Sequence, residues 1–246
     1  QGFRHRVFIK ELFPCHPRGW IYRNESGEIC CREDGREWME RCRRSFYQGN
    51  EANLDLLGQA PEKISGNINS YEAYGTFYSV LSVHGGTNLK QILMEEKKEY
   101  SLKESVEVMK KILPALDAFH RNGLLHLDIS PDNILLLPSQ ALLIDYNSVW
   151  DIHDIDARDF VFSEKQGYSA PEIRLRNAGD VNYSTDIYSV CAVFFHLLLR
   201  RPLRGEEAGG QELKRVLESM VIGCEKKAGV HANEFRIKNM RTRWGT

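Results

Sequence analysis

The segment from Leu124 to Asp145 restricts the possible fold more than any other part of the chain. It contains His126-Leu-Asp128, then Asn133 five residues after the aspartate, and a second apolar run that ends at Asp145. Short apolar runs on both sides of a polar loop predict a hairpin. Such a hairpin can bring two carboxylates and an amide together. A carboxylate that orients a hydroxyl, beside oxygen ligands for Mg²⁺, suits phosphoryl transfer.

The spacing His126-x-Asp128-x-x-x-x-Asn133, followed by Asp145, resembles the catalytic and metal-binding loops of protein kinases. Aminoglycoside and choline kinases carry a similar loop, so further motifs are needed to distinguish them. They occur in the order found in protein kinases: Val7-Phe-Ile-Lys10, Ala170-Pro171-Glu172, and Asp186 at the start of an apolar helix. The resemblance is therefore to protein kinases of the bacterial serine/threonine type, over roughly residues 7–203.

This resemblance implies an α+β, two-lobed fold with an antiparallel-sheet small lobe and a mainly helical large lobe. Residues 1–83 would form a partial small lobe ending at the hinge, and residues 84–246 the large lobe. The family has a glycine-rich loop before the lysine strand, but here only Gly2 precedes Lys10. We therefore expect the small lobe to be truncated, and the polar stretch after Pro202 to make the large lobe incomplete or divergent.

The nucleotide-binding residues also follow from the resemblance. Lys10 would grip the α and β phosphates of ATP, and Glu51 would be its partner on a helix predicted over residues 37–57. Glu37 and Glu40 lie on the same helix and remain alternatives. A hairpin predicted over residues 68–83 would end in the gatekeeper, Leu81. The hinge whose backbone binds adenine would follow it and consist of Ser82, Val83 and His84.

The catalytic roles concern the loop itself. Asp128 would be the catalytic base, and Asn133 and Asp145 would ligate Mg²⁺. Leu127 replaces the arginine usual before the aspartate, and Ser130 replaces a lysine that touches the transferring phosphoryl group. A hydroxyl cannot supply that charge, so we expect slow catalysis with nearly normal ATP affinity.

Two functions from different classes follow. The first is an enzyme, an ATP-dependent protein serine/threonine kinase that acts on protein substrates. The second is a pseudokinase, a nucleotide- or protein-binding signalling module that keeps the fold without the activity. A small-molecule kinase is disfavoured by Ala170-Pro171-Glu172.

Composition restricts the remaining possibilities. The chain has 33 lysines and arginines against 34 acidic residues. We therefore do not expect a protein that binds nucleic acid over its whole surface. The apolar run at residues 190–195 is too short to span a bilayer, and no signal peptide is recognisable, which predicts a cytoplasmic protein.

The six cysteines indicate reduced thiols. A zinc site near Cys15, Cys30 and Cys42 stays an alternative, although no paired C-x-x-C motif supports it. The oligomeric state is not indicated.

Overall fold

The computed structural model describes residues 6–59, 62, 64–82, 85–153 and 161–204. The chain divides into two compact units, Gln1–Leu203 and Arg204–Thr246, and the description below concerns the first. Within the described residues, no helix is both long and apolar enough to cross a membrane.

A three-stranded antiparallel sheet contains the strand of Lys10. Its strands are β1 (Val7–Glu11), β5 (Thr76–Ser82) and β4 (Asn67–Ala73), in the order β1-β5-β4. Lys10 lies opposite Ser79 in the register. Gly75 turns β4 into β5 with a φ of 72°, which glycine adopts without strain. The predicted strand and hairpin are confirmed.

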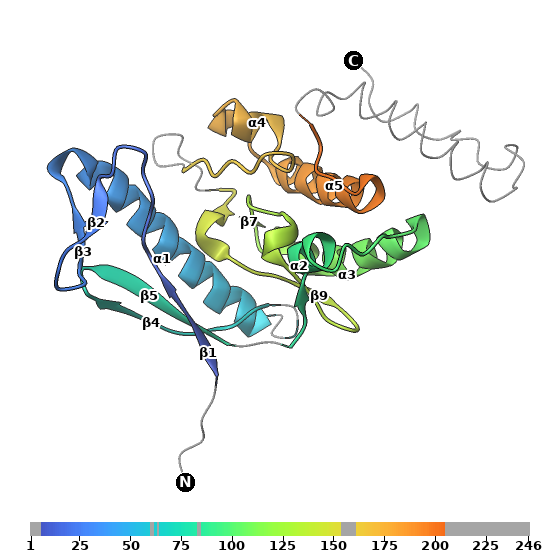
Figure 1. The fold of residues 1–246 in the computed structure, drawn as a ribbon, viewed down its shortest axis with the longest axis horizontal. Helices are drawn as coiled ribbons and strands as arrows, with labels where there is room; N and C mark the ends of the chain where they lie inside the picture. The colour runs from blue at the N-terminus through green and yellow to red at the C-terminus, as the bar shows by residue number, and fades with distance from the viewer. Residues whose placement is uncertain (1–5, 60–61, 63, 83–84, 154–160, 205–246) are drawn as a thin grey trace, which may run out of the picture. The chain divides into compact units, whose positions relative to one another are not determined.

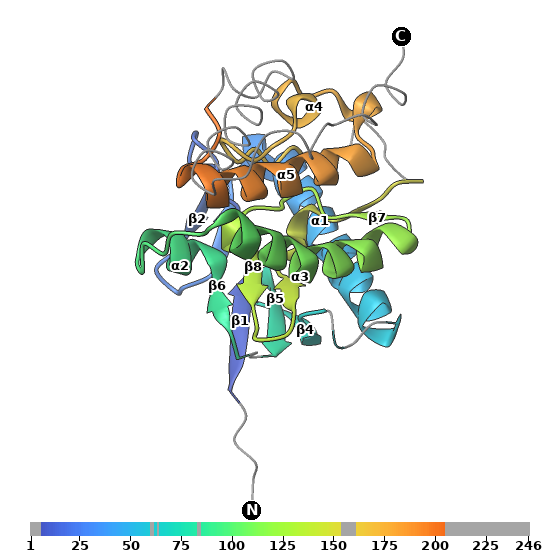
Figure 2. The same cartoon turned by 90° about the vertical axis from the view of Figure 1, so that its right-hand side faces the viewer.

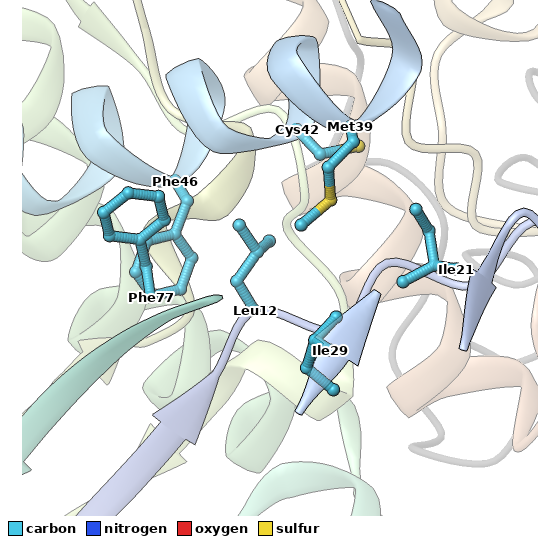
Figure 3. Close-up of a cluster of buried hydrophobic side chains, with 7 residues drawn as sticks. All are labelled: Leu12, Ile21, Ile29, Met39, Cys42, Phe46 and Phe77. Carbon is cyan, nitrogen blue, oxygen red and sulfur yellow. The ribbon is translucent and has the colours of Figure 1, made fainter. Parts of the chain in front are cut away.

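Helix α1 (Arg36–Gln59) packs against this sheet, and a small hairpin lies at one end of both (Figure 1). The hairpin consists of β2 (Ile21–Arg23) and β3 (Ile29–Cys31). The composition of residues 13–36, which is polar with two prolines and three glycines, had given no sign of these strands. Figure 3 shows that the buried side chains of the hairpin, the sheet and α1 meet in one cluster: Leu12, Ile21, Ile29, Met39, Cys42, Phe46 and Phe77.

The rest of the compact unit is mainly helical. It contains α2 (Leu89–Met94), α3 (Leu102–Arg121), α4 (Pro171–Arg174) and α5 (Tyr183–Leu199). Ser101 and Glu104 form a capping box at the start of α3. Helices α3 and α5 pack side by side (Figures 1 and 2). The predicted α+β class is confirmed.

Short strands and single turns of 3-10 helix connect these helices. One sheet has the order β6 (Thr87–Asn88), β8 (Ile134–Leu136), β9 (Ala141–Leu143), and another pairs β7 (Leu124–Leu125) with β10 (Trp150–Asp151). The 3-10 turns are Glu33–Gly35, Pro131–Asn133, Tyr146–Ser148 and Ala178–Asp180. The polar loop of the sequence therefore lies between β7 and β8, and Asp145 follows β9. The predicted lobe boundary falls at residues 83–84, outside the described residues, and stays a prediction.

Candidate active site

The polar loop holds Asp128 and Asn133 in direct contact. The Asn133 side-chain amide donates to the Asp128 carboxylate Oδ2 and to its backbone carbonyl, at 2.8 Å each. The backbone N–H of Ile144 donates to the Asn133 carbonyl at 2.9 Å, because β8 and β9 are paired just beyond. This pairing places Asp145, the next residue, beside the loop.

Asp186 anchors the loop from the first turn of α5. It is fully buried and accepts hydrogen bonds from the backbone N–H groups of His126 and Leu127, at 2.8 Å each. Nε2 of His120 lies 3.0 Å from the same carboxylate. Leu127 has a φ of 58°, an uncommon conformation for a branched side chain. Asp186 thus ties down the backbone of the loop.

Lys10 and Asp145 form an ion pair across 135 residues of sequence. Burial acts to raise the pKa of Asp145, but the Lys10 ammonium and the N–H of Asn147 outweigh it and hold that pKa below its usual value. Asp145 itself has a φ of 68°. The structure thus brings together Lys10, Asp128, Asn133 and Asp145 from three separate segments of the chain.

Asp128 is the most desolvated carboxylate of this group. Burial, chiefly, raises its pKa to about 6, and the charge of Asp145 adds to this, while Lys165 and the Asn133 hydrogen bond oppose it. In the part of the chain that the structure describes, its Oδ1 atom is buried without a hydrogen-bond partner. A carboxylate with this pKa is mostly ionised at neutral pH and can still accept a proton.

Lys165 is the residue of this site that the sequence analysis missed. Its Nζ lies 3.6 Å from Asp128 Oδ1 and 3.6 Å from Asp132 Oδ2. The available signal was a basic residue near the end of a mainly acidic segment before Ala170-Pro171-Glu172. No local pattern relates that position to Asp128, because the contact depends on how the segment folds back.

The structure does not bring Glu51 to Lys10. Glu51 is exposed on α1, while the face of α1 that meets the residues after Asp145 carries Ser45 and Gly49. Ser45 donates its hydroxyl to the carbonyl of Asn147. A Cβ at Gly49 would overlap the carbonyl oxygen of Tyr146. Since each helical residue turns by about 100°, Glu51 points well away from this contact.

The predicted hinge residues are only partly described. Leu81 and Ser82 end β5 and are half-buried, and Ser82 N–H donates to the Gly66 carbonyl at 2.9 Å. Val83 lies outside the described residues.

Asn133 and Asp145 have the chemistry that Mg²⁺ requires. An amide oxygen and a carboxylate are hard oxygen ligands, and Mg²⁺ in phosphoryl-transfer sites binds through one or two carboxylates plus substrate phosphates. Among the described residues, the Asn133 side chain makes its hydrogen bonds through its nitrogen, which leaves its oxygen for a cation. For zinc, the described residues contain no cluster of three or more histidine, cysteine or acidic side chains suited to a metal.

Comparison with known proteins agrees with this site. The family model described as protein kinase domain matches residues 51–240, a region that includes Asp128, Asn133 and Asp145 but not Lys10. The chain is 32% identical over 164 residues to the serine/threonine-protein kinase PknD of Mycobacterium tuberculosis, which covers 64% of this chain and 24% of that protein. It is 28% identical over 116 residues to the human MAPK/MAK/MRK overlapping kinase, which covers 47% of this chain and 27% of that one. The chain thus spans about a quarter of the length of these curated relatives.

A solved structure described as the PpkA-294 apo form resembles this fold. The TM-score is 0.60 at 23% identity, over 80% of this chain and 68% of that one. This likeness concerns the fold alone, and it confirms the two-lobed fold expected from the motifs.

Proposed function

The chain belongs to the protein kinase domain family, and on this basis we propose that it transfers the γ-phosphoryl group of ATP to serine or threonine hydroxyls of protein substrates. One observation carries the proposal. The ion pair between Lys10 and Asp145 and the hydrogen bond between Asn133 and Asp128 support the proposal, because they hold together the residues proposed as phosphate-binding cation, base and oxygen ligands.

In the proposed reaction, Asp128 accepts the proton of the substrate hydroxyl. A bond forms between that oxygen and the γ-phosphorus, and the bond from the γ-phosphorus to the oxygen of ADP breaks. Asn133 holds Asp128 in position through its amide. Lys10 exchanges part of its contact with Asp145 for the ATP phosphates. Mg²⁺ held by Asn133 and Asp145 would neutralise charge on those phosphates.

Adenine binding is proposed for the backbone at Leu81, Ser82 and Val83, where the small lobe of residues 1–83 would join the large lobe. For Lys10 we propose Asp145 as the partner in place of Glu51, because the exposed carboxylate of Glu51 lies on another face of α1.

A transfer assay tests this function. The full chain is incubated with Mg²⁺, γ-labelled ATP and a histone mixture, and the labelled amino acids are identified after hydrolysis. Labelled phosphoserine or phosphothreonine is the expected product. Label on tyrosine alone, or on a small-molecule acceptor alone, would refute the proposed acceptor class.

The second candidate function is a pseudokinase, a module that binds nucleotide or protein without transfer. It is favoured by the replacement of the usual cationic residues by Leu127 and Ser130, both of which are buried. Mg²⁺-dependent ATP binding without any transfer would select this function.

A further inference from the structure

We propose that Lys165 supplies the positive charge beside the transferring phosphoryl group that the catalytic loop lacks at Ser130. The inference rests on the proposed kinase function and adds a catalytic residue to it. Lys165 comes from the segment before Ala170-Pro171-Glu172, about thirty-five residues after Ser130.

Ser130 cannot supply this charge itself. Its side chain is fully buried, and within the described residues its hydroxyl has no hydrogen-bond partner. A neutral hydroxyl would in any case stabilise the charged phosphoryl oxygens far less than an ammonium group does.

The Lys165 ammonium occupies the place where such a charge is needed. It lies 3.6 Å from an oxygen of Asp128 and 3.6 Å from one of Asp132. Both distances exceed a normal hydrogen bond, so neither carboxylate binds the ammonium closely. The Asp128 oxygen that it faces is buried and accepts no hydrogen bond among the described residues. A γ-phosphoryl group next to Asp128 would therefore lie within reach of Lys165.

The backbone of Lys165 is well fixed. Its N–H donates to the Ser169 hydroxyl at 2.7 Å, and its carbonyl accepts from the N–H groups of Tyr168 and Ser169 at 3.0 Å each. The Tyr168 hydroxyl in turn contacts Nδ1 of His196 on α5 at 2.5 Å. This turn is thus anchored to the same helix that carries Asp186, which holds the catalytic loop. An ammonium fixed in advance stabilises developing charge without reorganisation.

Lys165 takes no proton during the transfer of the γ-phosphoryl group. Asp128 receives the proton of the attacking hydroxyl, the γ-phosphorus changes its oxygen partner from ADP to the substrate, and the Lys165 ammonium contacts the phosphoryl oxygens throughout.

Lys90 offers a matched control. It also pairs with Asp132, at 3.0 Å, but it has no recorded contact with Asp128, and 57% of its side chain is exposed against 31% for Lys165. Both lysines thus neutralise Asp132, and only Lys165 reaches the proposed base.

The experiment compares turnover and ATP affinity in the full chain for Lys165→Met, Lys165→Arg and Lys90→Met. We expect Lys165→Met to lower kcat by about 10²- to 10³-fold with little change in the ATP dissociation constant. Lys165→Arg should keep most of the rate, and Lys90→Met should keep all of it. Circular dichroism verifies that each variant is folded. If Lys165→Met does not fold, the kcat of Lys165→Arg, compared with that of Lys90→Met, tests the inference instead.

Several results would overturn the inference alone, with wild-type transfer intact. They are an unchanged or faster Lys165→Met variant, equal losses in Lys165→Met and Lys90→Met, or a loss in Lys165→Arg as large as that in Lys165→Met. A faster variant would mean that Lys165 only blocks Asp128. A wild type that binds ATP with Mg²⁺ but transfers nothing would overturn the proposed function, and this inference with it.

Discussion

Asp128 and Asp145 carry different tasks in the proposed site, although both are carboxylates within the same hairpin region. Asp145 pairs with the cation Lys10, whereas Asp128 is bound by the neutral amide of Asn133. The environment of each carboxylate shows in its pKa, which is lowered for Asp145 and raised to about 6 for Asp128.

The two aspartates should therefore respond differently to removal of charge. Asp145→Asn removes the proposed metal ligand and should abolish Mg²⁺-dependent ATP binding, while Asp128→Asn should leave most of that binding and remove transfer. Calorimetric titration with ATP, with and without Mg²⁺, measures both variants. Equal losses of affinity would contradict the assigned roles.

Gly49 sets how closely α1 approaches the residues that follow Asp145. Because the carbonyl of Tyr146 occupies the space of a Cβ, Gly49→Ala should force a shift and destabilise the fold by about 1–3 kcal/mol. Gly58 on the same helix has open space at this position, so Gly58→Ala should be neutral or stabilise by up to about 1 kcal/mol. Urea unfolding measures the stability of both variants. An unchanged stability of Gly49→Ala would show that this contact does not set how closely α1 approaches the residues after Asp145.

The residues of the loop were predictable, and so was Lys10, which approaches from β1, because the resemblance names it; other residues that approach from elsewhere were not. Asp128, Asn133 and Asp145 were grouped from sequence through a predicted hairpin. The pairing of β8 with β9 does bring Asn133 and Asp145 together, whereas Asp128 lies between β7 and β8, which pair with other strands. The contacts of Lys165 and Gly49 depend on how distant segments pack, and neither has a periodic or local signal. Glu51 was chosen because the segment from Phe46 to Leu54 resembles the helix that carries the glutamate partner of the lysine, and such a resemblance does not fix which face of α1 meets the sheet; in the structure Glu51 is exposed.

At the scale of elements, an apolar cluster holds the catalytic loop against the segments that follow it. Leu127 is buried there with Leu125, Trp150 and Ile173, and the partly buried Phe162 packs against them. An apolar residue thus stands where the resemblance leads us to expect an arginine, and its contacts are hydrophobic.

A charge at this position should be costly. Leu127→Arg would place a guanidinium in the apolar cluster without a designed partner, and we expect a loss of about 3 kcal/mol or more in the free energy of unfolding. Leu127→Met conserves volume and should cost less than about 1.5 kcal/mol. Denaturant titration compares the two, and similar stabilities would mean that the cluster tolerates a charge.

The elements differed in how clearly the sequence marked them. Helix α3 was predictable because a capping box precedes a regular apolar stripe, and the hairpin of β4 and β5 because apolar and aromatic residues flank a glycine turn. The β2–β3 hairpin was missed because its strands have three residues each and one inward side chain apiece, Ile21 and Ile29. So short a pattern carries no period, and the strands are stabilised by tertiary contact with α1.

At the scale of the whole molecule, a buried histidine makes the stability depend on pH. His196 on α5 is 5% exposed, and burial lowers its pKa below the usual value of 6.5. Above that pH the side chain is neutral in both states. As the pH falls through about 6.5, the unfolded chain gains a proton that the folded chain resists, so stability is lost.

Unfolding measured at about pH 7.5 and about pH 5.5 should show this loss. One group contributes at most about 1.4 kcal/mol per pH unit. The matched variant His196→Gln keeps a hydrogen-bond acceptor for Tyr168 and cannot titrate, so its stability should fall less between the two values. An identical pH dependence in both proteins would refute the role of His196.

The proposed activity is tested most directly by a single turnover with the chain in excess over γ-labelled ATP and Mg²⁺, in the presence of the histone mixture. The wild type should move the label to serine or threonine. Asp128→Asn should bind the same ATP with similar affinity and transfer at least about a hundredfold more slowly. Equal label in both proteins would mean that another residue is the base, and ATP bound without transfer by the wild type would mean that this kinase fold signals by binding alone.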